Sequence, residues 1–218
     1  KETPARARVL GSDSSTQSGK ALLVDADTGE VVDQGRANHP DGTEVDPRAW
    51  VDTMTEATDG LLDRADAVSV AGQQHGMVAL DAEGEVVRDA LLWNDTRSAR
   101  AAEDLIAELG GERACVEATG SRYVASITAT KLRWMRDHEP ANAARTASVL
   151  LPHDYLTWHL SGHGEKVTDH GEASGTGYYS TRERSWRPDL AERALGHPVD
   201  LPRLAGPNEK VGTVAAQV

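Results

Sequence analysis

Phenylalanine is absent from the 218 residues, and Cys115 is the single cysteine. One cysteine cannot form a disulfide within the chain, which fits a reducing compartment. No apolar run approaches the roughly 18 residues of a membrane helix, and the start of the chain lacks the apolar stretch of a signal peptide. We therefore expect a cytoplasmic protein that does not associate with a membrane.

Positive charge is scarce, and the formal net charge is -12 at pH 7. A protein that binds a polyanion needs a basic surface, so this balance argues against a nucleic-acid partner. It does not exclude ATP, because a local group of backbone N–H donors can hold phosphate within an acidic protein. The length fits one large domain or two small ones. Residues 1–8 carry no initiating Met and are expected to be a disordered, trimmed or engineered end.

The first third of the chain predicts a sheet. Short apolar runs at 9–11, 21–24 and 30–37 are typical of strands, with a turn at Asp27-Thr28-Gly29 between the last two. A second hairpin is expected from 78–80 and 85–87. The run 67–71 predicts a further strand that ends at Gly72. Antiparallel hairpins and a strand–helix–strand order together favour a mixed α/β sheet.

Helix signals dominate the remainder. Asp46-Pro47 is a typical helix start, with an N-cap followed by proline at the first helical position. Helices are also expected over 99–109, ending at Gly110, and from Pro152 to Leu160. Residues 147–151 predict another strand.

Asp13 follows the first predicted strand and precedes small hydroxyl residues. A carboxylate in this position can hold Mg²⁺, so Asp13 is the candidate metal ligand. Backbone N–H groups and side chains of the next residues can face phosphate, with a lysine adding positive charge. The candidate phosphate-binding residues are Ser15, Thr16, Gln17 and Lys20. A polar hairpin turn without a ligand is the alternative that these residues leave open.

A second candidate site begins where the predicted strand ends at Gly72. Open α/β sheets bind ligands at the carboxyl ends of their strands. Gln74 and His75 combine donors and acceptors, as a polyol requires, and Gly76 would leave room for the ligand. A histidine buried in the core and bonded to a carbonyl is the alternative for His75.

A third segment, Trp93-Asn94-Asp95, follows an apolar pair. The indole could cover the carbons of a sugar while the amide and carboxylate bond its hydroxyls. Plain core packing is the alternative for Trp93. Three other patterns are set aside: a metal pair at His159 and His163, a hydrolase serine at Ser174, and a nucleophilic Cys115, which we expect to pack in the core.

Six segments in a fixed order resemble the N-terminal domain of the FGGY carbohydrate kinases. The resemblance covers nearly the whole chain, from about Val9 to Gly212. Its segments are residues 11–18, 72–76, 92–97, 130–134, 151–158 and 168–177.

The resemblance implies a ribonuclease-H-like, actin-like ATPase domain, with a mixed central sheet flanked by helices. It implies transfer of the ATP γ-phosphoryl group to D-xylulose, giving D-xylulose 5-phosphate. By analogy Asp13 places Mg²⁺ as the catalytic metal ligand, and residues 15–17 and Lys20 approach the ATP phosphates. The sugar would contact Gln74, His75, Trp93, Asn94 and Asp95. Three further matching residues are expected to be structural: Lys131, Asp154 and Asp169.

Two departures limit the analogy. Ser15 stands where members of the family often have glycine, which restricts φ in the phosphate loop. The chain also stops before the family's general-base aspartate and its adenosine-binding domain. We therefore expect residues 9–218 to be the sugar-binding half, inactive in isolation. Another sugar kinase of the family, acting on ribulose, glycerol or gluconate, is one alternative, and a non-catalytic sugar-binding fragment is another. A homodimer is also expected from the family.

Overall fold

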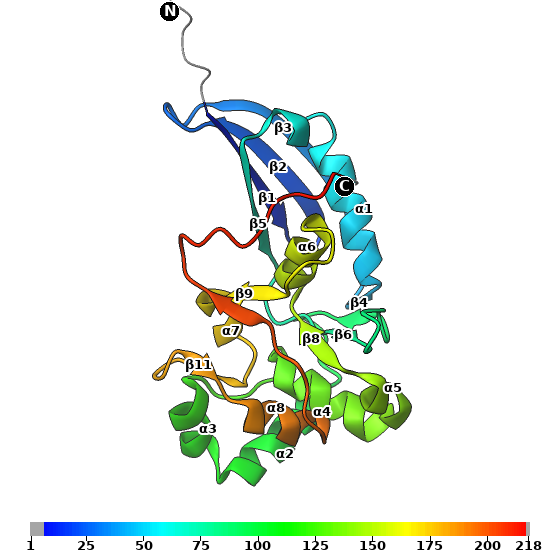
Figure 1. The fold of residues 1–218 in the computed structure, drawn as a ribbon. Helices are drawn as coiled ribbons and strands as arrows, with labels where there is room; N and C mark the ends of the chain where they lie inside the picture. The colour runs from blue at the N-terminus through cyan, green and yellow to red at the C-terminus, as the bar shows by residue number, and fades with distance from the viewer. Residues whose placement is uncertain (1–6, 217–218) are drawn as a thin grey trace, which may run out of the picture.

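The computed structural model describes residues 7–216, in which one end holds a sheet and the other is mostly helical (Figure 1). The largest sheet is mixed, because β1 pairs antiparallel with β2 and parallel with β5. This confirms the expected mixed sheet. Its strands, in spatial order, are β3 (Val31–Asn38), β2 (Ser18–Asp25), β1 (Arg8–Ser14) and β5 (Ala67–Gly72).

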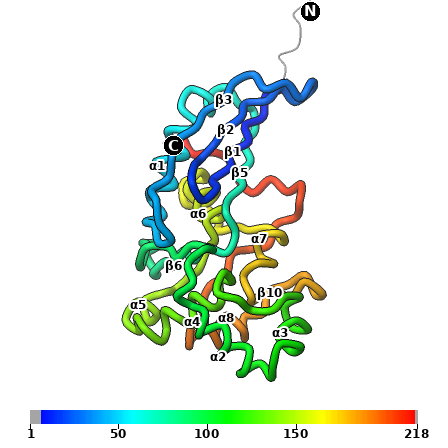
Figure 2. Tube along the Cα trace, turned by 180° about the vertical axis from the view of Figure 1, so that it is seen from behind, coloured from blue at the N-terminus to red at the C-terminus, as the bar shows by residue number. Residues whose placement is uncertain are grey.

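One face of this sheet is covered by helix α1 (Pro47–Thr58), which contacts β2 and β3. Leu10 and Leu23 are buried beneath it, whereas Val9 and Leu22 point to the other face and are exposed. This alternation is the period-two pattern of a half-buried sheet. Helix α6 (Pro152–Leu160) contacts both α1 and the edge strand β5. Figure 2 shows the same sheet from behind.

Strand β1 is longer than the sequence predicted. It runs from Arg8 through Ser14, because Asp13 is paired on both sides, with Lys20 of β2 and Ala71 of β5. Only residues 15–17 are left for the turn to β2. The expected disordered end is therefore wrong for Arg8, while residues 1–6 of that prediction lie outside the described part of the chain.

The predicted helix boundaries are confirmed. The Asp46 carboxylate accepts a hydrogen bond from the Arg48 backbone N–H and caps α1, with Pro47 as the first helical residue. Helix α2 (Ala99–Leu109) ends at Gly110, whose φ of 98° is left-handed. These elements are fixed by local chemistry.

The second predicted hairpin is only partly correct. A turn at Asp81–Gly84 is present, but residues 85–87 make one isolated bridge, between Val86 and Leu80. Strand β6 (Val78–Leu80) also pairs with β8 (Ser148–Leu150), which is far along the chain, so β6 has a partner on each side. The other two-stranded sheets are β4 (Glu44–Val45) with β7 (Ala90–Leu91), β9 (Val167–Asp169) with β12 (Arg203–Ala205), and β10 (Tyr179–Ser180) with β11 (Ser185–Trp186).

The remaining helices pack mostly away from the large sheet, around a core that includes Leu132 and Leu190. Cys115 is fully buried in this core and serves packing. Within residues 7–216, no helix has the length and apolar character needed to cross a bilayer. The remaining helices are α3 (Glu112–Thr119), α4 (Thr128–His138), α5 (Pro140–Arg145), α7 (His170–Ser174) and α8 (Pro188–Leu195). A 3₁₀ turn at Leu62–Arg64 lies at the large sheet, where Leu62 packs against the core that holds Leu10.

Candidate functional site

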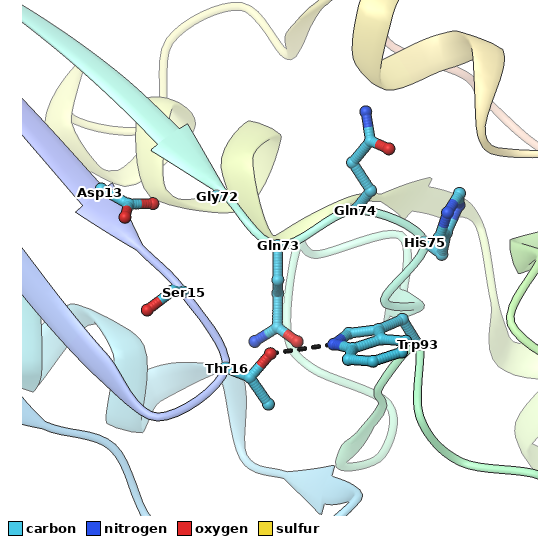
Figure 3. Close-up of a pocket in the computed structure, with 8 residues that line it drawn as sticks. All are labelled: Asp13, Ser15, Thr16, Gly72, Gln73, Gln74, His75 and Trp93. Atoms are coloured by element: carbon cyan, nitrogen blue, oxygen red, sulfur yellow. Dashed lines mark hydrogen bonds between the residues drawn. The ribbon is translucent and has the colours of Figure 1, made fainter.

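A pocket of about 360 Å³ lies at the edge of the large sheet where β1 and β5 end. These two strands are parallel, with Ser14 opposite Gly72, so their carboxyl ends meet at the same edge. This is the position at which α/β sheets bind ligands. The residues that line it are Asp13, Ser15, Thr16, Gly72, Gln73, Gln74, His75 and Trp93 (Figure 3).

The pocket brings together both sites predicted from the sequence. One side, here called the aspartate wall, is residues 13–16. The other, the histidine wall, is residues 72–75, and Trp93 stands beside both. Four predicted site residues do not line this pocket: Gln17, Lys20, Asn94 and Asp95.

The aspartate wall is a short turn with an exposed carboxylate. Ser15 Oγ donates to the Ser18 carbonyl at 2.9 Å, which closes the turn. Behind it, buried His39 bonds Ser14 Oγ through Nε2 at 3.0 Å. Asp13 itself is exposed, and no group in residues 7–216 donates a hydrogen bond to its carboxylate. Its oxygens are therefore available to a cation or to water.

The donor set on this wall fits Mg²⁺ that arrives with a nucleotide. Within residues 7–216 there is no group of three or more His, Cys, Asp or Glu side chains that could hold a metal on their own. Mg²⁺ commonly keeps several waters and uses one or two carboxylates plus substrate phosphates. The single carboxylate of Asp13 suits that mode, in which protein ligands are few.

The histidine wall is held by contacts from distant segments. The Nδ1 atom of His75 lies 2.8 Å from the Gly175 carbonyl, and Thr128 Oγ1 donates to the His75 carbonyl at 3.0 Å. A carbonyl only accepts, so Nδ1 carries the proton and Nε2 of the neutral ring is an acceptor. Burial lowers the pKa of His75, while the bond to Gly175 opposes that shift. The backbone of His75 is left-handed, with φ of 69°, which is a strained conformation typical of functional sites.

Two glycines bring this wall close to helix α6. A Cβ on Gly72 would lie 3.0 Å from the His153 backbone nitrogen, and one on Gly76 would lie 2.8 Å from Pro152 Cγ. The prediction that Gly76 makes room for a ligand is therefore wrong, because the space next to it is taken by Pro152. Both glycines allow the loop to pack on the start of α6.

Trp93 lines the pocket and is bonded to the aspartate wall. Its Nε1–H donates to Thr16 Oγ1 at 2.9 Å (Figure 3). The residue is 44% exposed. Core packing is therefore excluded for this indole. An aromatic face at the edge of a polar pocket can cover the carbons of a sugar.

Asp95 is buried and already partnered. Its carboxylate accepts from Thr43 Oγ1 at 2.7 Å and from Arg97 Nε at 2.9 Å. Burial alone would raise the pKa of Asp95, but these bonds hold it below its ordinary value. Lys131, also buried, donates to the backbone carbonyls of Asp95 and Ala125. Asp95 thus secures the segment that carries Trp93, and the neighbouring Asn94 is exposed.

Asp154 and Asp169 both act at helix starts. Asp154 accepts from the Leu151 backbone N–H at 2.9 Å, and Asp169 caps α7 by accepting from Glu172 N–H at the same distance. These contacts support the structural roles expected for them.

Gln73 and His39 are pocket or loop residues that the sequence analysis did not select. Gln73 lines the pocket, and His39 supports the turn from below. Gln73 could have been found from the alternation of side chains along a strand. Residues 73 and 74 follow the end of β5 and must point to different sides, so Gln74 alone could not represent both. His39 carried no local signal.

A larger hollow, of about 1010 Å³, lies between β5, α6, β9 and residues 205–216. None of the predicted site residues lines it. The smaller pocket holds the polar groups that converge, so chemistry rather than volume identifies the candidate site.

Comparison with known proteins agrees with this geometry. Residues 8–218 match the FGGY family of carbohydrate kinases, N-terminal domain. A xylulose kinase of Streptomyces coelicolor is 50% identical over 213 residues, which is 94% of this chain and 44% of that protein. The crystal structure of xylulose kinase from Bifidobacterium adolescentis superposes with a TM-score of 0.88 at 41% identity, covering 94% of this chain and 48% of that one. The chain thus spans less than half the length of these relatives, and its fold is that of their actin-like N-terminal domain.

Proposed function

Because the chain belongs to the FGGY family of carbohydrate kinases, we propose that it forms the sugar-binding half of an ATP-dependent kinase that phosphorylates D-xylulose. The observation that carries this proposal is the single pocket between the aspartate and histidine walls. Phosphoryl transfer needs a phosphate group and an acceptor hydroxyl held side by side. The two walls supply groups suited to each.

The histidine wall would bind the ketose. A neutral His75 presents Nε2 as a hydrogen-bond acceptor for a sugar hydroxyl, while Gly175 keeps the ring in that tautomer. Gln74 is exposed at the pocket, and its long contact of 3.5 Å to the Gly171 carbonyl leaves its amide free to bond another hydroxyl. The Trp93 indole would lie against the carbons of the sugar.

The aspartate wall would bind the phosphate end of ATP. Ser15 and Thr16 offer hydroxyl and backbone donors at the end of β1. Asp13 would hold Mg²⁺, which supplies charge neutralisation for the transferring group. Gln17 and Lys20 are further candidates for contact with the ATP phosphates. Lys20 lies directly opposite Asp13 in the sheet.

The acceptor hydroxyl must lose a proton as the new bond forms. His75 is a poor base because its pKa is lowered, and Asp13 is assigned to the metal. We therefore assign the proton acceptor, with the adenosine-binding groups, to a part of the kinase beyond this chain. A cytoplasmic location suits a reaction that consumes ATP.

Calorimetric titration tests the sugar assignment. The chain is titrated with D-xylulose, D-ribulose, glycerol and gluconate under the same conditions. We expect D-xylulose to bind most tightly. Tighter binding of another compound would move the substrate to a different member of the family.

A chimera tests the kinase assignment. The chain is joined to the C-terminal half of the Streptomyces coelicolor relative, and ATP turnover with D-xylulose is measured. We expect Asp13→Ala in this chimera to lower kcat by about 10²–10³-fold, as loss of a group that stabilises transition-state charge does. Unchanged turnover in the variant would show that Asp13 has no chemical role, and a binding module is favoured if the unmodified chimera binds D-xylulose without turning over ATP.

A further inference from the structure

Gln73 carries a buried amide with no partner. The residue is 8% exposed, and neither Oε1 nor Nε2 makes a hydrogen bond within residues 7–216. It is the only side chain in this described range with two such atoms. A buried polar group without a partner costs free energy, and proteins keep few of them. The position therefore calls for an explanation.

The amide belongs to the candidate pocket. Gln73 lines it, and its side chain points toward the Thr16–Trp93 hydrogen bond (Figure 3). Its backbone N–H donates to the Ser14 carbonyl at 2.9 Å, which ties the ends of β5 and β1 together. This bond fixes the backbone of Gln73 at the sheet edge, so the amide can move only by rotation about its own side-chain bonds.

We propose that Gln73 is an additional sugar-binding residue, whose amide takes its hydrogen-bond partners from the polyol when Trp93 moves aside. This inference rests on the proposed function of the pocket. Within the described residues, the Trp93 side chain makes one hydrogen bond, to Thr16, and the residue is nearly half exposed. A ligand that replaces this one bond can reach the amide behind it.

The chemistry favours a hydroxyl over a phosphate as the partner. An amide has an acceptor oxygen and a donor nitrogen, and both are unpaired here. A sugar hydroxyl both donates and accepts, so adjacent hydroxyls satisfy both atoms. Phosphate oxygens only accept, and they would leave Oε1 unpaired.

This arrangement predicts opposite effects on stability and on binding. Gln73→Met keeps the length of the side chain and removes both unpaired atoms. We expect it to raise the Tm of the ligand-free chain by about 2–4 °C. The same change should weaken D-xylulose binding about tenfold, as expected for one lost neutral hydrogen bond.

The matched control is Gln34→Met, at an exposed glutamine on β3 that does not line the pocket. It should leave Tm and sugar affinity unchanged. If Gln73→Met lowers Tm and leaves sugar affinity unchanged, Gln73 is a structural residue and the inference is overturned. Weaker binding of Mg²⁺-ATP with unchanged sugar affinity would also overturn it, because the partner would then be phosphate.

The same experiment separates this inference from the proposed function. If D-xylulose does not bind the unmodified chain, the assigned substrate is wrong. The inference still holds in that case if another polyol of the panel binds and loses affinity in Gln73→Met while Tm rises. It fails if no polyol affinity depends on Gln73.

Discussion

The two walls of the pocket differ in how they are held. The histidine wall is fixed by groups from three distant segments: the Gly175 carbonyl, the Thr128 hydroxyl and the start of α6. The aspartate wall lies at a short turn that is closed by Ser15–Ser18 contacts and held from outside by His39 and Trp93, but its carboxylate is exposed. One wall is set before a ligand arrives, and the other is open to it.

This difference matches what each ligand brings. A neutral sugar carries no charge to organise its site, so its affinity depends on groups that are already in place. A nucleotide with Mg²⁺ brings strong charge, which can order a short exposed turn on binding. We therefore expect changes to the supports of the histidine wall to matter more than changes to the aspartate wall in sugar binding.

The largest effect is expected from Gly175→Ala. A Cβ at this position would lie 2.5 Å from the Nδ1 and Cε1 atoms of the His75 ring. Such overpacking costs about 1–3 kcal/mol of stability, and the displaced ring loses its acceptor position. We expect a lower Tm and a loss of sugar affinity of about tenfold or more, measured by calorimetry.

The control for this change is Gly11→Ala, because a Cβ on Gly11 meets nothing within 4 Å. It should leave sugar affinity unchanged. Equal affinity in Gly175→Ala and the unmodified chain would show that the His75 ring does not contact the sugar.

Sugar binding should also depend on pH through His75. Burial lowers the pKa of this ring, so the neutral form persists below the ordinary value near 6.5. Protonation turns Nε2 into a donor, and affinity should fall as pH decreases through the lowered pKa. Titrations between pH 7.5 and 4.5 measure this. The control variant is His75→Asn, because asparagine tolerates the left-handed backbone. Its remaining sugar affinity should vary less with pH. If the pH profile is identical in this variant, the pH dependence belongs to another group.

Glu172 lies in α7, the helix that leads to Gly175. A change at Glu172 therefore tests the segment that supports the His75 ring. Burial raises the pKa of Glu172 to about 7, with Asp154 and Asp169 adding to the shift and His153 opposing it. The folded state therefore holds this proton more tightly than the unfolded state. The stability that this bound proton contributes is fully present below the pKa of the unfolded state, near 4.5, and is lost as pH rises through the folded-state pKa of about 7.

Glu172→Gln removes this titration. At pH 8 we expect the variant to be more stable than the unmodified chain by about 1–2 kcal/mol, after allowance for partial exposure. The advantage should shrink toward pH 5. Denaturant unfolding at both pH values measures it, and a pH-independent difference would contradict the assignment.

The smallest effect is expected from Trp93→Phe, which keeps a ring but removes the N–H that bonds Thr16. One exposed hydrogen bond contributes about 0.5–1.5 kcal/mol at most. Amide hydrogen exchange should quicken at residues 15–17 and stay unchanged at His75. Faster exchange on both walls would mean that they open together.

The sequence predicted those features that are set by neighbouring residues. Asp46 and Pro47 identified the start of α1, and Gly110 identified the end of α2, because caps act within one turn. The two candidate sites were predicted because Asp13 and Gly72 each follow an apolar run, and the structure shows that these strand ends meet at one sheet edge.

Features set by distant residues could not be predicted in the same way. Val78–Leu80 was assigned to a local hairpin, which it forms through a short bridge to Val86, but its longer pairing is with Ser148–Leu150, and a local pattern cannot name a partner so far away. Gly76 was assigned to ligand space because nothing near it in the sequence shows that Pro152 packs there. Asp95 has a carboxylate that could bond a sugar hydroxyl, yet this carboxylate already accepts hydrogen bonds from Thr43 and Arg97.

The bond between His75 and Gly175 joins residues 100 positions apart. During synthesis the large sheet and α1 are complete once Gly72 has been made, whereas the imidazole gains its anchor only after a further hundred residues have been added. Chains grow at about 5–20 residues per second, so for several seconds a nascent chain would carry the turn with Asp13 but no ordered sugar site.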